Sequence, residues 1–122
     1  MYKVAIVGSR KFCDYKLMKE ILDPVRDKIA MIISGGAIGA DTLAQQYAKD
    51  NGLTILIYYP EWKKYRKKAG FIRNVKIANV AERMIAFAYP DSRGTRHVVR
   101  KMKDLNKPAC VVELQHENLG DK

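Results

Sequence analysis

The feature that most constrains the fold of this chain is a regular alternation of short apolar segments with longer amphipathic ones. The apolar segments are rich in β-branched residues and bounded by glycine or polar residues, which is typical of buried strands. They lie at residues 2–8, 30–34, 53–59, 83–89 and 108–114. Because strands that alternate with helices are joined by right-handed crossovers, this order predicts a parallel sheet with helices on both faces.

The segments between these strands have helical spacing of apolar residues, which predicts helices at about 14–29, 39–51, 71–81 and 95–106. Asp14 can cap the first helix, and Pro24 predicts a kink or break within it. Residues 61–70 are expected to form an irregular or helical connector. In the helix over 71–81, the positions expected to face the core are Ile72, Val75, Ile77 and Val80.

These elements predict an α/β protein with a single Rossmann-like three-layer α/β/α sandwich and a mainly parallel sheet of about five strands. The 122 residues suffice for one sizeable core, so we expect one domain over residues 1–114 and a flexible tail over 115–122. The helix faces of such a small domain also allow a homo-oligomer. A single short domain without a fused effector suits a phage or mobile element.

Membrane insertion and secretion are not expected from this sequence. No apolar run approaches the roughly 18 residues of a membrane span, and the N-terminus lacks the layout of a signal peptide. The two cysteines, Cys13 and Cys110, show neither metal spacing nor a disulfide framework. His97 and His116 have no ligand partners at metal spacing. We therefore expect a cytoplasmic protein with no metal site and no cofactor.

The positive charge of the chain is concentrated in one continuous region. Residues 60–107 hold 14 of the 23 Lys and Arg but four of the 13 acids, which equals the whole net charge of +10. Such a bias predicts an anionic partner, either a nucleotide, a nucleic acid or an acidic protein. The alternative is that the lysines only solvate helix faces.

Three of the predicted strands are followed by glycine together with Ser, Thr or Arg: GSR at 8–10, GGAIGAD at 35–41 and DSRGT at 91–95. Ligands of open parallel sheets bind beyond the carboxyl ends of the strands. Glycine lets the backbone approach a ligand, and a helix N-terminus offers free N–H groups to a phosphate. A single such turn could be only a tight connection, but three at one sheet edge favour a phosphate-binding site. No P-loop or dinucleotide fingerprint is present.

Two further features have both a structural and a functional interpretation. Asp41 lies in the first turn of a predicted helix, where an acid either favours the helix dipole or binds a ribose hydroxyl or a base edge. The segment 58–74, YYPEWKKYRKKAGFIRN, alternates aromatic residues with cations. It could stack a base and hold phosphates, or follow single-stranded nucleic acid, or pack amphipathically with its lysines in water. Within it, Arg73 and Asn74 are the pair favoured for function.

The motifs GSRKF, SGGAIGADTLA, YPEWKKYRKKAGFIRN and RGT together closely resemble the YspA/YpsA-related branch of the SLOG superfamily. These are Rossmann-like domains related to the lonely-guy phosphoribohydrolases and to the DNA-processing protein of natural transformation. The resemblance covers about residues 3–113. It implies a nucleotide-type ligand at the strand ends, because superfamily members bind or cleave nucleoside monophosphates, sense NAD-derived signals, or bind single-stranded DNA.

The residues that match these family motifs are the ones expected to bind the ligand. They are Gly8, Ser9, Arg10, Gly35, Gly36, Ala37, Gly39, Asp41, Arg73, Asn74, Gly94 and Thr95.

The chain departs from the phosphoribohydrolases at their PGGxGTxxE motif. The corresponding stretch reads DSRGTRHVV, and no acid follows on that helix before Asp104. Cleavage of an N-glycosidic bond requires a carboxylate, by analogy with glycoside hydrolysis, and Asp41 and Glu61 are the plausible substitutes. Catalysis, if present, would use Asp41 as the acid with Arg73 orienting the phosphate.

The leading hypothesis is a protein that binds a nucleotide or NAD-derived nucleotide at the carboxyl edge of the sheet, as a sensor, sequestering or processing protein. The first alternative is a nucleotide N-glycosidic hydrolase resembling the phosphoribohydrolases. The second alternative is a single-stranded nucleic-acid-binding protein, which the charge of residues 60–107 favours.

Overall fold

A computed structural model describes residues 1–116 and has a five-stranded sheet with all strands parallel. The strands are β1 (Tyr2–Gly8), β2 (Ile29–Ser34), β3 (Ile55–Ile57), β4 (Arg83–Ala88) and β5 (Ala109–Glu113). Their order across the sheet is β3-β2-β1-β4-β5. From β1 the chain adds β2 and then β3 on one side of the sheet. It then crosses to the other side of β1 and adds β4 and β5. This confirms the predicted Rossmann-like fold.

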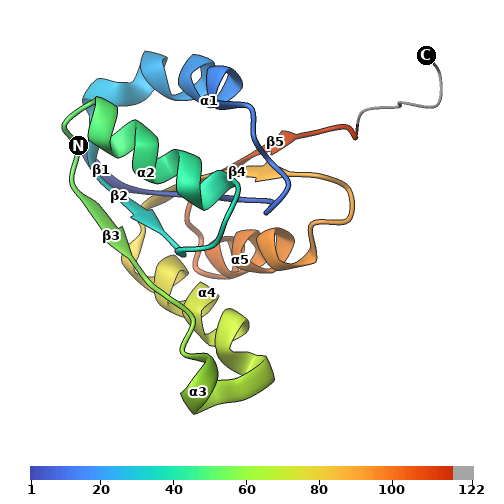
Figure 1. Cartoon of the computed structure of the whole chain (residues 1–122). Helices are drawn as coiled ribbons and strands as arrows, with labels where there is room; N and C mark the ends of the chain where they lie inside the picture. The colour runs from blue at the N-terminus through green and yellow to red at the C-terminus, as the bar shows by residue number, and fades with distance from the viewer. Residues whose placement is uncertain (117–122) are drawn as a thin grey trace, which may run out of the picture.

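The helices form a layer on each face of the sheet (Figure 1). One face is covered by α1 (Tyr15–Leu22) and α2 (Ala40–Asp50), and the other by α4 (Ala69–Val80) and α5 (Arg93–Asp104). The short helix α3 (Trp62–Tyr65) and a 3-10 turn (Arg66–Lys68) precede α4 and project beyond the end of the sheet. No helix in residues 1–116 is both long and apolar enough to cross a membrane.

Alternating residues of β1 separate the core into two halves. Val4 and Ile6 pack with α1 and α2, while Ala5 and Val7 pack with α4 and α5. Because β1 is central and covered on both sides, its sequence is continuously apolar rather than alternating. This explains why the short β-branched runs identified the strands correctly.

The first predicted helix is divided in two at its proline. Asp14 caps α1 by accepting a hydrogen bond of 3.0 Å from Leu17 N. Pro24 lies in the first turn of a 3-10 helix over Asp23–Lys28, where its missing N–H removes no helical hydrogen bond. The cap and the break were both predicted.

The side of α4 that faces the core agrees with the prediction at Ile77 and Val80 and differs from it at Val75. Val75 is 39% exposed, whereas Asn74, Ile77 and Ala78 are buried. From Asn74 onward the helix therefore presents positions spaced by three and four to the core, and a polar residue occupies one of them. A search for apolar residues alone selected Val75 wrongly because the inward position at 74 is an asparagine.

The third strand is shorter than predicted, and most of the predicted tail lies outside the described residues. The strand predicted over 53–59 is paired with β2 only at Ile55–Ile57. Of the tail predicted over 115–122, residues 117–122 lie outside the described part of the chain. His116 stacks on Tyr89 at 4.3 Å between ring centroids and lies 3.1 Å from Asp91.

Gly39 immediately precedes α2 and packs against the loop that follows β1. Its φ is +81°, and a Cβ at this position would collide with the backbone of Ser9 and Arg10. This close approach lets Ala40 N donate a 3.1 Å hydrogen bond to Ser9 O. The glycine is therefore required by the packing of two strand-end loops against each other.

We expect Gly39→Ala to destabilise the fold more than Gly52→Ala does. Both residues have positive φ, which costs a non-glycine residue about 1–3 kcal/mol, but a Cβ at Gly52 would meet no atom within 4 Å. Urea denaturation of both variants separates the shared backbone cost from the collision at Gly39. Equal losses would show that the two loops adjust without cost.

Candidate functional site

A cavity of about 410 Å³ opens at the carboxyl edge of the sheet. It lies where the order of strands reverses, between the loop after β1 and the start of α5, and the first turn of α4 closes its other side. This is the position at which open α/β sheets bind ligands. Ten of the residues predicted from sequence line it: Gly8, Ser9, Arg10, Gly35, Ala37, Asp41, Arg73, Asn74, Gly94 and Thr95.

Four of the five predicted glycines at this edge are packed closely against other protein atoms. A Cβ at Gly8 would lie 2.6 Å from Phe87 O, and one at Gly35 would lie 2.6 Å from Arg73 Nη1. At Gly36 it would collide with the ring of Tyr59, and Gly36 and Gly39 lie outside the cavity lining. Protein atoms, rather than a ligand, therefore explain the absence of side chains at these positions.

Gly94 is the exception among the predicted glycines. A Cβ added there would meet no heavy atom within 4 Å, and Gly94 lines the cavity. It lies in the first turn of α5, where backbone N–H groups lack helical partners. Within the described residues, neither Gly94 nor Thr95 donates its N–H to a backbone or side-chain acceptor. This turn therefore presents free donors and a positive helix end to the cavity.

Asp41 is the most deeply buried acid of the site, at 5% exposure. Its Oδ2 accepts a 2.9 Å hydrogen bond from Ala37 N, whereas its Oδ1 has no hydrogen-bond partner within residues 1–116. Burial raises the pKa of Asp41 to about 6, although the Ala37 N–H, the Arg73 guanidinium and the nearby Ser34 hydroxyl act against this. The nearby Ser34 hydroxyl is also buried and also lacks a partner within these residues, so Asp41 and Ser34 leave two polar atoms unsatisfied and covered by protein.

Arg73 connects α4 to the end of β2. Its Nη1 donates to Gly35 O, and its Nε donates to Asn74 Oδ1 at 3.0 Å. Burial lowers the pKa of Arg73, the Asp41 carboxylate opposes this, and Arg10 adds a further lowering. Since an arginine stays protonated in proteins, Arg73 and Arg10 bring two positive charges to one wall of the cavity.

Asn74 holds α4 and α5 together rather than facing the cavity with free groups. Its Oδ1 is occupied by Arg73, and its Nδ2 donates to Gly94 O at 3.1 Å and lies 3.2 Å from His97 Nδ1. Burial, together with Lys101 and Arg100, lowers the pKa of His97, so the neutral ring can accept from Asn74. Asn74 thus positions the start of α5 relative to Arg73.

The cavity also contains residues of the quoted motifs that were not among those expected to bind the ligand. Lys11 follows the GSR motif directly, and Ser92 and Asp91 precede the GT pair. Trp62, Lys67, Gly70 and Phe71 belong to the segment in which aromatics alternate with cations, and all four line the cavity. The sequence identified this segment as a candidate. It did not show that these four side chains meet at one cavity, because that depends on how α3 packs against α4.

The acids proposed as catalytic substitutes occupy different environments. Asp41 lines the cavity, whereas Glu61 immediately precedes α3, lies outside the lining and pairs with Lys76 at 3.2 Å. Val98, the fifth residue counted from Gly94 in the GTxxE spacing, lines the cavity with an apolar side chain. In residues 1–116, no three His, Cys, Asp or Glu side chains come together to hold a metal ion.

Comparison with known proteins agrees with this architecture. A solved structure entitled "X-ray structure of DNA processing protein A (DprA) from Streptococcus pneumoniae" superposes with a TM-score of 0.75 at 21% sequence identity. The match covers 96% of this chain and 51% of that protein, so this chain spans about half its length. At this identity the likeness establishes the fold alone. The comparison with curated proteins gave no match.

The family model described as "YspA, cpYpsA-related SLOG family" matches residues 2–65 of the 122-residue chain. This match spans β1 to α3, and so contains Ser9, Gly35 and Asp41 of the cavity. It confirms the resemblance predicted from the motifs. The chain belongs to the YspA, cpYpsA-related SLOG family.

Proposed function

We propose that this protein binds a nucleotide, either a nucleoside phosphate or an NAD-derived nucleotide, as a sensor, sequestering or processing protein. The observation that carries the proposal is one cavity that combines a positively charged helix start with an unpaired, buried acceptor. The cavity lies at the sheet edge, where the strand order reverses. Its size falls within the range of small-ligand sites, roughly 300–1,000 Å³.

The phosphate end of the ligand is assigned to the loops after β1 and β4. The free N–H groups of Gly94 and Thr95 stand at the positive end of α5. Arg10 and Lys11 line the same cavity, and Lys11 N donates to Ser9 Oγ at 3.1 Å, which fixes this loop. Both features favour an anion.

The sugar is assigned to Asp41. Asp41 lines the cavity, its Oδ2 accepts from Ala37 N, and its Oδ1 is covered by protein without a partner in residues 1–116. Rotation of this side chain toward the cavity would let Oδ1 accept from a ribose hydroxyl and so gain a partner. The family and the DprA-like fold support a nucleotide-related or DNA-processing role in general.

The first alternative, N-glycosidic hydrolysis, is favoured by the pKa of about 6 at Asp41, which would allow proton exchange near neutral pH. It requires a carboxylate at the glycosidic bond, and the GTxxE glutamate position holds Val98. We expect release of free base from a nucleotide to be abolished in Asp41→Asn. Chromatography of a nucleoside monophosphate panel after incubation tests this, and no free base from wild-type protein would remove the alternative.

The second alternative is binding of single-stranded nucleic acid. The exposed cations that precede α4 favour it: Lys63, Lys64, Arg66, Lys67 and Lys68. Its distinguishing property is affinity that falls steeply with salt, because each neutralised phosphate releases counterions. A compact cavity accommodates a single nucleotide more readily than a strand, so the small-ligand proposal is preferred.

Calorimetric titration with AMP, NAD, ADP-ribose and cyclic ADP-ribose tests the proposal directly. We expect binding of at least one, with Gly94→Ala weakening it because the new methyl group would cover the free N–H groups. The same substitution should leave the free energy of unfolding unchanged or raise it by about 0.5–1 kcal/mol, since alanine suits a helix better than glycine. Failure of the whole panel at millimolar concentration would contradict the proposal.

The pKa of Asp41 predicts a pH dependence of stability. The folded state raises this pKa from 3.8 to about 6, so it binds the proton more tightly than the unfolded chain does. The resulting stabilisation is fully present below about pH 4 and is lost as the pH rises through about 6. Asp41→Asn, which stays neutral, should therefore gain stability relative to wild type between these values, by up to ~3 kcal/mol.

Urea denaturation of both proteins from pH 4 to pH 7 measures this difference. Asp27→Asn, which removes an exposed acid of the 3-10 helix over Asp23–Lys28, is the matched control. A stability difference between wild type and Asp41→Asn that does not change with pH would show that Asp41 ionises as easily in the folded protein as in water.

A further inference from the structure

We propose that Trp62 and Phe71 form the base-binding side of the cavity, so that its ligand is a nucleotide whose purine or pyrimidine ring is free to stack. This inference rests on the proposed function and assigns one end of the ligand to particular side chains. It goes beyond the strand-end motifs, because both residues belong to the segment over 58–74 that follows the edge strand β3.

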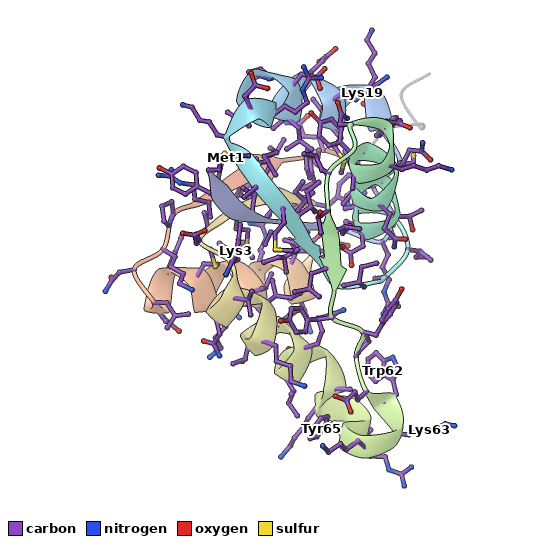
Figure 2. All side chains as sticks on the ribbon, turned by 90° about the vertical axis from the view of Figure 1, so that its left-hand side faces the viewer. Met1, Lys3, Lys19, Trp62, Lys63 and Tyr65 are labelled. Atoms are coloured by element: carbon purple, nitrogen blue, oxygen red, sulfur yellow. The ribbon has the colours of Figure 1, made fainter. Side chains whose placement is uncertain are left out.

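Both aromatic side chains line the cavity and remain partly exposed to solvent. Trp62 is 51% exposed and Phe71 is 54% exposed, and, unlike the exposed Tyr59 and Ile38, both line the cavity. Figure 2 shows Trp62 with Lys63 and Tyr65 on a projection that extends away from the sheet. Exposed aromatic surface that adjoins a cavity is typical of a ligand-binding wall.

The ring of Phe71 is held in place from the other side. It makes an edge-to-face contact with His97, with 4.6 Å between centroids and 64° between planes. His97 in turn lies 3.2 Å from Asn74 Nδ2, which also bonds Gly94 O. Phe71 is therefore positioned by the same contacts that place the start of α5, and a rigid ring loses little entropy when a base stacks on it.

Gly70 leaves room in front of these rings. A Cβ added there would meet only Trp62 Cη2, at an ordinary contact distance of 3.8 Å, so the packing of the protein does not require a glycine. Glycine within a helix is nevertheless destabilising relative to alanine. A helical glycine that the fold does not need, located in a cavity wall beside two open aromatic rings, indicates space kept for another molecule.

Cationic side chains line both sides of the cavity, since Lys67 and Arg73 come from the same segment as the aromatic pair, and Asp91 adds an acid on the loop after β4. The free N–H groups at the start of α5 distinguish the end that would hold a phosphate. Arg10, Lys11 and the free N–H groups of α5 lie on the loops after β1 and β4, while the aromatic pair comes from α3 and α4. A nucleotide has the same two chemical poles, an anionic phosphate and a flat base. Stacking accepts any base, so the aromatic wall selects for the presence of a base rather than for its identity.

Trp62 is the single tryptophan of the chain, so its fluorescence reports on this wall specifically. The probes are AMP, GMP, CMP and UMP, with ribose 5-phosphate as the ligand that lacks a base. We expect nucleotides to change the emission of Trp62, and ribose 5-phosphate to bind in calorimetry without changing it. Phe71→Ala and Trp62→Ala should weaken nucleotide binding roughly five- to hundredfold and leave ribose 5-phosphate affinity unchanged.

Three further variants complete the test. Trp62→Phe keeps an aromatic ring and should retain most of the affinity. Tyr59→Ala removes an exposed aromatic residue outside the cavity lining and should have no effect. Gly70→Ala should increase the urea concentration needed for unfolding while weakening nucleotide binding, a combination that loss of folding cannot produce.

The outcomes separate this inference from the proposed function. Nucleotide binding in calorimetry that is insensitive to Trp62→Ala and Phe71→Ala, with constant Trp62 emission, would overturn the aromatic site and leave the proposed function intact. Equal affinity for a nucleotide and for ribose 5-phosphate in the wild type would do the same. Binding of none of these probes, nor of the NAD-derived compounds, would overturn both.

Discussion

The buried carboxylate of Asp41 is the constraint on which the geometry of the cavity depends. It closes the turn after β2 through Ala37 N and lies beside the guanidinium of Arg73. Arg73 bonds Gly35 O and Asn74, and Asn74 bonds Gly94 O at the start of α5. A buried acid, a neighbouring guanidinium and these hydrogen bonds therefore connect elements from both faces of the sheet. Such an acid is costly to bury, and its raised pKa reflects that cost.

The fold was predictable because its strands are buried on both faces and its turns are marked by glycine and polar residues. The continuously apolar run of β1 and the break at Pro24 needed only local information. The inward face of α4 was not fully predictable from the sequence, because a polar residue, Asn74, occupies a core-facing position and donates a hydrogen bond to a distant turn. Only the packed structure reveals that partner.

The site was predictable as a location but not in the roles of its residues. The motifs identified the strand ends, and ten of the matched residues surround one cavity. Gly8 and Gly35 proved to be packed against protein atoms, while Gly94 is open. A sequence shows that a side chain is missing but not what fills the space, because the neighbouring atom belongs to a residue far along the chain.

The cationic residues in the second half of the chain have more than one structural role. Arg96 pairs with Glu113 at 2.8 Å, and Lys107 Nζ donates to the carbonyl oxygens of Ala78 and Asn79 at the end of α4. These cations support the fold, whereas Lys67 lines the cavity. A count of charges is therefore a guide to the sign of the ligand and not to the residues that bind it.

The projection formed by α3 and the following 3-10 turn packs against α4 and contributes little to either half of the core. It nevertheless supplies one wall of the cavity through Trp62 and Lys67. We therefore expect substitutions in this projection to change the shape of that wall without changing the stability of the sheet. Residues 62–68 can therefore be substituted to change this wall while the sandwich beneath it keeps its sequence.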